Sequence, residues 1–157
     1  MRTFIYLLSL TGFCLFGCRR ESPVFTGVPL SIYIVSEEKI DGGRFIDTEE
    51  FPKIGYIAAT PDLAITRLDM VSTNGQKTSA PVKQRVELII TMRPEDAKKF
   101  TAITDKATGK RLLLMLGDTP LIAPMVRGPI PTQSIVLTLG DKVDQKKIED
   151  GLKKLVW

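Results

Sequence analysis

Hydrophobic residues recur at strand and helix spacings through the second half of the chain. Leu88 and Ile90 share one face of a strand predicted at residues 86–91. Pro94 is typical of the first position of a helix, and Gly109 is typical of the residue that ends one. Between them, the apolar face of the predicted helix comprises Ala97, Phe100, Ile103 and Ala107.

Three strands and a second helix are predicted after this helix. The strands are expected at residues 112–116, 121–126 and 134–139. The second helix begins after Asp144, a good N-cap residue, and its apolar face comprises Ile148, Leu152 and Leu155. The order β-α-β-β-β-α, with hairpins between strands, predicts an α+β fold in which two helices pack on one face of an antiparallel sheet.

The first half of the chain has shorter apolar runs. A strand is predicted at residues 30–35 and a second apolar run at 54–59. Residues 63–71 fit neither the strand nor the helix period, so this stretch stays open between a short helix and a strand. No stretch after residue 29 resembles a linker, so a single domain is expected at residues 30–157.

An apolar, proline-rich hairpin tip follows the strand predicted at 121–126. Loops are normally polar, so a contiguous apolar tip indicates contact with another molecule. Pro120 and Pro124 place the strand at a sheet edge or a bulge, and an edge can accept an extended peptide as a further strand. Alternatively, Val126 and Ile130 fold back onto the sheet. The candidate polypeptide contacts are Ile122, Met125, Val126, Pro129, Ile130 and Pro131.

The first residues have the pattern of a secretory signal. Arg2 precedes an apolar run at residues 4–16, which is too short for a convincing transmembrane helix. The run ends in Leu15-Phe16-Gly17-Cys18, which resembles the lipobox of bacterial lipoproteins. In that family the cysteine is acylated and becomes the new N-terminus. The resemblance implies a signal peptide at residues 1–17; an uncleaved anchor helix is the alternative reading.

Lipidation would also define the compartment. The resemblance implies anchoring to the lipid bilayer through acylated Cys18, with residues 18–29 as a tether that contains Pro23, Gly27 and Pro29. The domain is then expected in the bacterial cell envelope, on the extracytoplasmic side of the membrane. Arg19, where many inner-membrane lipoproteins have Asp, is compatible with the outer membrane.

Composition excludes several kinds of chemistry. The 157 residues include no histidine, which removes the usual general base and the commonest transition-metal ligand. Cys14 would leave with the signal and Cys18 would be acylated, so no thiol remains for catalysis or metal binding. The net charge of +4 is modest, and the lysines of the chain are interspersed with acidic residues, so no nucleic-acid partner is expected. We therefore expect no enzymatic activity, no metal and no cofactor.

A series of short motifs in residues 91–139 resembles the periplasmic head of SecD, a membrane component of protein export. The motifs are Arg93-Pro94-Glu95, Ala97-Lys98-Lys99-Phe100, Thr104, Gly109-Lys110, the strand at 112–116, Gly117-Asp118, Ala123-Pro124-Met125-Val126 and the strand at 135–139. The resemblance implies the fold of that head and a surface that contacts polypeptide. SecD usually has paired glycines after Ala-Pro, where this chain has Pro131-Thr132-Gln133, so a stiffer loop is expected.

These observations predict a membrane-tethered, non-enzymatic module that binds polypeptide or protein. By the SecD resemblance, its partners would be exported polypeptides or proteins of the envelope or translocase. The proton-driven motor of SecD with SecF is not expected, because no stretch after residue 17 has the length and hydropathy of a spanning segment. The alternative is a small structural or inhibitory envelope lipoprotein that uses the same fold without a role in export.

Overall fold

The structure, a computed structural model, describes residues 27–49, 51–74, 87–139 and 144–156. The predicted signal peptide, Cys18 and most of the predicted tether lie outside the described residues. The described part is an α+β fold, as predicted from the sequence, and its strands pair antiparallel. From β6 onward, the order of elements is the predicted β-α-β-β-β-α. The strands are, however, divided over three sheets where the sequence indicated one.

The largest sheet has four strands in the order β4-β1-β7-β8. Every residue of β7 is buried, because this strand lies in the interior of the sheet and both of its faces are covered. The β7–β8 hairpin turns at Gly117 and Asp118, as the sequence indicated. The bounds of the four strands are Leu30–Ile34 for β1, Leu63–Ile65 for β4, Leu112–Leu116 for β7 and Thr119–Ile122 for β8.

A second sheet has three strands in the order β5-β6-β9. The stretch 63–71, which the sequence left open, is strand throughout most of its length, but it is split between β4 of one sheet and β5 of the other. This split explains why neither period fits the stretch, since the two strands bury different faces. The bounds are Leu68–Asn74 for β5, Glu87–Met92 for β6 and Ser134–Thr138 for β9.

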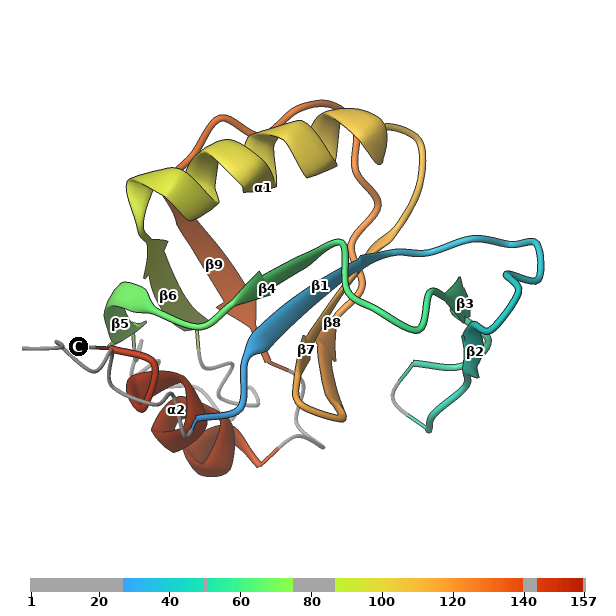
Figure 1. Cartoon of the computed structure of the whole chain (residues 1–157). Coiled ribbons are helices and arrows are strands. Elements are labelled where there is room, and N and C mark those ends of the chain that lie inside the picture. The colour runs from blue at the N-terminus through green and yellow to red at the C-terminus, as the bar shows by residue number, and fades with distance from the viewer. Residues whose placement is uncertain (1–26, 50, 75–86, 140–143, 157) are drawn as a thin grey trace, which may run out of the picture.

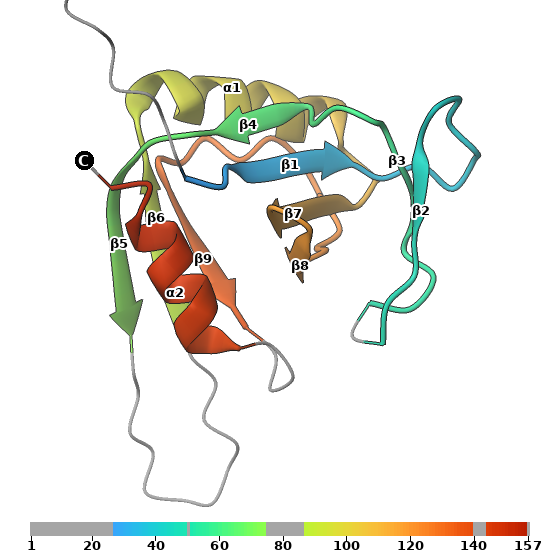
Figure 2. The same cartoon turned by 60° about the horizontal axis from the view of Figure 1, so that its bottom comes forward.

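Both helices pack into one core that the two larger sheets share. Helix α1 spans Pro94–Lys106 and helix α2 spans Gln145–Lys153; they lie at opposite ends of the domain (Figures 1 and 2). Both helices lie on the same face of the four-stranded sheet, because its other face belongs to a separate core. The shared core includes Ile32, Leu88, Ile90, Phe100, Leu114, Leu137, Ile148 and Leu152.

A two-stranded ribbon covers the other face of the four-stranded sheet. It consists of β2 (Arg44–Ile46) and β3 (Gly55–Ile57), and it stands at one side of the domain in Figure 1. Ile46 and Ile57 pack there on a smaller core with residues such as Tyr33 and Leu113. The apolar run at 54–59 predicted β3, but β2 was missed, because only one of its three residues is buried and no alternating pattern marks it.

Candidate functional site

An apolar cavity of about 270 Å³ opens between the two larger sheets, where edge strand β8 lies near edge strand β9. Its floor is core: Phe100 of α1 is 3% exposed, and Leu112, Leu114 and Leu137 are also buried. Its rim is formed by the segment after β8 and by β9. The rim residues are Ile122, Pro124, Met125, Val126, Ile130, Thr132, Ser134, Ile135 and Val136. We call this cavity the edge groove.

The edge groove brings together four of the six residues that the sequence singled out: Ile122, Met125, Val126 and Ile130. Met125 is 52% exposed and Ile130 is 38% exposed, so both present apolar surface. Val126 is only 3% exposed and belongs to the core, as the alternative interpretation of the tip expected. Pro129 and Pro131 are exposed but are not among the lining residues.

Two backbone hydrogen bonds hold Val126 against the loop that follows α1. Its N–H donates to the carbonyl of Lys110 at 2.8 Å, and its carbonyl accepts from the N–H of Gly109 at 2.9 Å. Gly109 ends the helix in a left-handed conformation with φ +80°, which explains the glycine there. The buried base of the tip is therefore fastened by main-chain bonds.

A buried threonine of α1 fastens the other side of the tip. Thr104 has no exposed surface; its hydroxyl donates to the carbonyl of Thr101 at 2.9 Å and accepts from the N–H of Ile130 at 2.9 Å. The Thr101 hydroxyl lies 3.2 Å from the Ile130 carbonyl and 3.0 Å from the Ala97 carbonyl, so its one hydrogen is shared between these two acceptors. Thr104 was one of the motif residues, and the structure shows what its hydroxyl does: it positions Ile130 at the rim of the groove.

Strand β9 offers an unpaired backbone edge to the groove. The N–H of Met92 donates to the carbonyl of Gln133 at 2.8 Å, so the backbone of Gln133 faces β6. Because backbone groups alternate in direction along a strand, Ser134, Val136 and Thr138 direct theirs to the outer edge. Among the described strands, none pairs with that edge. Both backbone groups of Ser134 are bonded to the Thr132 hydroxyl. Within the described ranges, the outward backbone groups that stay open are those of Val136 and Thr138.

The facing edge of β8 is partly closed. The Pro124 carbonyl accepts from the N–H of Leu112 at 3.0 Å, so Pro124 faces β7, and Ala123 directs its backbone outward. The Ala123 carbonyl already accepts from Arg111 Nη1 at 3.1 Å. The Pro124 carbonyl is therefore not free to bind an added strand; the side chain of Arg111 covers this edge, and β9 is the more open of the two.

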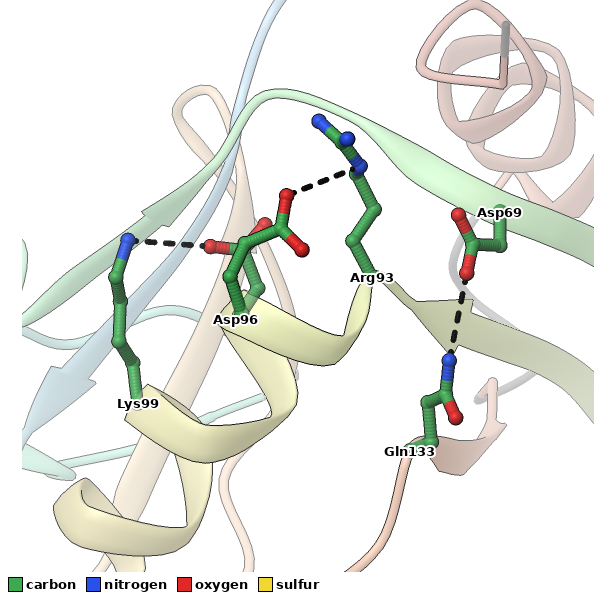
Figure 3. Close-up of polar contacts among 6 residues, drawn as sticks. Asp69, Arg93, Asp96, Lys99 and Gln133 are labelled. Carbon is green, nitrogen blue, oxygen red and sulfur yellow. Dashed lines mark hydrogen bonds and ion pairs between the residues drawn. The ribbon is translucent and has the colours of Figure 1, made fainter.

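Polar contacts hold the start of β9 and the start of α1 (Figure 3). Gln133 Nε2 donates to Asp69 Oδ2 at 3.4 Å, which joins the residue before β9 to β5 at the far edge of the same sheet. On α1, Arg93 Nε lies 3.1 Å from Glu95, and Lys99 Nζ lies 3.4 Å from Asp96. These pairs are at the surface and away from the groove lining, so the groove itself stays apolar.

A second hollow of about 430 Å³ continues the groove along β8 toward its hairpin. It shares Ile122, Pro124 and Val136 with the first and adds Phe51 from the loop between β2 and β3. Neither Phe51 nor the β9 wall was expected from the sequence; Val136, on that wall, is 54% exposed. The alternation along β9 marked Val136 as facing away from the core, but only the fold places it beside β8.

Within the described residues, no group of three or more Asp, Glu, His or Cys side chains is placed to hold a metal ion. In the same part of the chain, neither helix has the length and apolar character needed to cross a bilayer. Among the described residues, the pKa of Glu149 is clearly lowered and the pKa of Lys153 is clearly raised, chiefly because the two side chains are hydrogen-bonded to each other. Both are on α2, and neither lines the edge groove.

The similarity of this chain to known proteins is found by comparison with solved structures. No protein-family model matches the chain, and no curated protein sequence matches it. It is similar to the solved structure of SecDF described as a membrane component that enhances protein export, with a TM-score of 0.57 and 22% identity over 82% of this chain. A structure of SecDF in a super-membrane-facing form matches equally, with a TM-score of 0.57 and 22% identity over 81%.

These matches show that the fold is SecD-like, which confirms the fold expected from the motifs at residues 91–139. They extend the likeness to the first half of the chain, where the motifs had given little sign of it. The chain spans 62% of the first matched chain and 18% of the second.

Proposed function

We propose that this protein is a lipid-anchored, non-enzymatic module that binds extended polypeptide on the extracytoplasmic side of a bacterial membrane. The observation that carries the proposal is the unpaired edge of β9 beside an apolar groove. An unpaired edge supplies hydrogen-bonding groups to any extended chain, and an apolar groove accepts side chains at alternate positions. The SecD-like fold supports the proposal, because SecDF is a component that enhances protein export.

The bound polypeptide would lie along β9 as an added strand. Val136 and Thr138 direct backbone groups outward, and each strand residue supplies one donor and one acceptor. Met125 and Ile130 at the rim, with Ile122 beside them, would contact alternate side chains of the polypeptide. Main-chain bonds and apolar burial are independent of exact sequence, so binding would tolerate many polypeptides and depend little on salt.

Acylation of Cys18 would keep this site at the membrane. Two or more acyl chains hold a protein on a bilayer durably, whereas one does so only marginally. The partners would be exported polypeptides, or envelope and translocase proteins that deliver them. In the alternative role, a structural or inhibitory envelope lipoprotein, the edge groove would bind no extended polypeptide.

The sharpest test of the edge site is a proline at position 136. Val136→Pro removes an outward N–H and leaves the β6–β9 hydrogen bonds in place, since edge strands tolerate proline. The probe is a fluorescent peptide of alternating valine and threonine. Its affinity should fall about five- to tenfold, the effect of about one lost hydrogen bond. The matched control is Val136→Thr, which keeps the N–H and should bind the peptide like the parent protein.

The second arm tests the apolar rim. Met125→Ser together with Ile130→Ser should weaken capture of the same peptide and leave Tm nearly unchanged, because both side chains are exposed. In living cells, a crosslinker at position 130 should trap polypeptide. Equal binding by Val136→Pro and Val136→Thr, with no crosslinked polypeptide, would contradict the proposed site and favour the structural or inhibitory role.

The anchor is tested separately. Cys18→Ala should block acylation, because no other residue in the lipobox can accept the lipid. Membrane fractionation and mass spectrometry of the mature protein give the answer. A parent protein that is mature but carries no acyl group would overturn the lipoprotein part of the proposal while leaving the edge groove to its own test.

A further inference from the structure

A different hollow, of about 500 Å³, lies at the α2 end of the domain. It opens between α2 and the β7–β8 hairpin, and its lining includes Val28, Thr119, Lys146, Lys147 and Lys154. None of these residues lines the edge groove. In Figure 1, α2 lies at the opposite end of the domain from α1, the helix whose Thr104 holds the tip. We call this surface the α2 face.

The α2 face is where the described chain enters the fold. Val28 is 53% exposed and packs on the hairpin turn: a Cβ added at Gly117 would meet Val28 Cγ1 at 2.6 Å. Ten residues along the chain separate Val28 from Cys18, so the distance between them cannot exceed about 35 Å whatever path the chain takes. An acyl group on Cys18 would therefore keep Val28, and with it the entry to the α2 face, within about 35 Å of the bilayer.

The same face carries the lysines of α2. Lys146, Lys147 and Lys154 are exposed, and within the described part of the chain no ion pair is formed by any of them. The fourth lysine, Lys153, is paired with Glu149 at 2.7 Å. Asp144 is occupied at the N-cap, where its carboxylate accepts from the N–H of Lys147 at 3.0 Å. Asp150, also exposed, lines the same hollow. The three lysines outnumber the two carboxylates of Asp144 and Asp150, so this surface beside the attachment point keeps a net positive charge.

We propose that the α2 face rests on the anionic phospholipid headgroups of the membrane that anchors the protein. This inference depends on the proposed acylation of Cys18. Three lysines would bind a membrane weakly by themselves, but a short covalent attachment raises their effective concentration at the surface. The contact thus selects an orientation: α2 and Val28 toward the bilayer, and the α1 end of the domain, where Thr104 holds Ile130, directed away from it. The edge groove would then open toward arriving polypeptide.

The test measures orientation on vesicles with the acylated, full-length mature protein. A fluorophore is attached at Val28→Cys on the α2 face or at Ala102→Cys on exposed α1, and the vesicles carry a headgroup-attached quencher. One set contains phosphatidylethanolamine with phosphatidylglycerol, and the other replaces the glycerol lipid with uncharged phosphatidylcholine. Flotation of the protein with both sets reports the anchor itself, independently of orientation.

Quenching at position 28 is expected to be about twofold or more stronger on anionic than on uncharged vesicles, and to lose that excess in high salt. Position 102 should show no such excess. The variant Lys146→Gln/Lys147→Gln/Lys154→Gln should abolish the excess at position 28. The matched control, Lys98→Gln/Lys99→Gln/Lys106→Gln, removes three charges from α1 and should retain it, because those lysines lie on the other helix.

Each other result counts against the inference. Because position 28 is near the anchor in any orientation, strong quenching there on both vesicle types contradicts a role for lipid charge. An excess that survives in the α2 variant, or that is lost equally in the α1 variant, excludes the α2 face as the contact. A protein that floats yet shows none of the differences overturns the orientation and leaves the anchor intact. A protein that does not float contradicts the anchor, and the inference falls with it.

Discussion

The two helices cover one core from opposite ends, yet they are fastened in different ways. Helix α1 has no side-chain cap at its N-terminus and begins with Pro94, whereas α2 is capped by Asp144. Buried Thr104 of α1 makes hydrogen bonds that hold the tip, whereas the polar bonds of α2 are at the surface, between Glu149 and its neighbours. Burial of Phe100 in α1 and of Leu152 in α2 is comparable.

The difference indicates separate roles for the two ends. The α1 end positions a surface segment, because the hydrogen bond that the Ile130 N–H donates to the buried Thr104 hydroxyl has a preferred direction as well as a preferred distance. The α2 end closes the core with apolar side chains and leaves its charges in water.

Phe100→Ala should have the largest effect. Phe100, on helix α1, is 3% exposed and forms part of the floor of the edge groove. Loss of its side chain should therefore lower the free energy of unfolding by about 3–5 kcal/mol. Chemical denaturation measures this, with exposed Lys98→Ala on the same helix as the control. An unchanged Tm would show that this helix face is not part of the core.

Thr104→Val tests the fastening of the tip. The substitution leaves the partly buried N–H of Ile130 without its acceptor, at an expected cost of about 1 kcal/mol. Hydrogen exchange at the Ile130 amide should also become faster, which an ordinary core defect would not predict. Thr101→Val is the matched variant, since its bond to the Ile130 carbonyl is at the surface and its loss should matter less. Equal effects of the two variants would contradict the special role of Thr104.

Asp144→Ala tests the N-terminal cap of α2. Loss of the bond from the Lys147 N–H should cost about 1 kcal/mol in the free energy of unfolding. Arg93→Ala at the corresponding position of α1 should cost less, because Arg93 makes no cap bond and only a surface ion pair with Glu95. The same denaturation measurement compares them; a larger effect at Arg93 would reverse the contrast.

Glu149→Gln should have the smallest effect on stability, and this effect should depend on pH. Hydrogen bonds from Lys153 and Thr73 hold the pKa of Glu149 below its ordinary value of 4.5. A lowered folded-state pKa stabilises the fold above the ordinary value, and this contribution is lost as pH falls through the folded-state pKa. The Tm of the parent should therefore exceed that of Glu149→Gln slightly at neutral pH, and the difference should shrink below pH 4.5. A difference that grows with acidification would contradict the assignment.

Local features of the sequence predicted the elements of the second half well. Pro94, the spacing of Phe100 and Ile103, and the cap at Asp144 act through residues a few positions away, so they are readable without the fold. The strand predicted at 121–126 was less accurate. Strand β8 ends at Ile122, and a bulge within it shifts its register opposite Leu114 and Met115.

Half of the candidate site was also visible in the sequence. Ile122, Met125 and Ile130 follow one another closely along the chain, so one wall of the groove could be found as an apolar run. The other wall, with Val136, could not. An exposed valine on one strand has no local mark that tells which other strand lies beside it.

The sequence by itself determined the α+β class, both helices, the buried face of each and the SecD-like character of the fold. Only the tertiary structure decided that the strands divide into three sheets, that β8 and β9 become neighbouring edges, and that the α2 lysines gather beside Val28. The physical reason is range: periodicity and caps arise from hydrogen bonds and packing within a few residues, whereas sheet edges and surfaces are formed by residues distant in the chain.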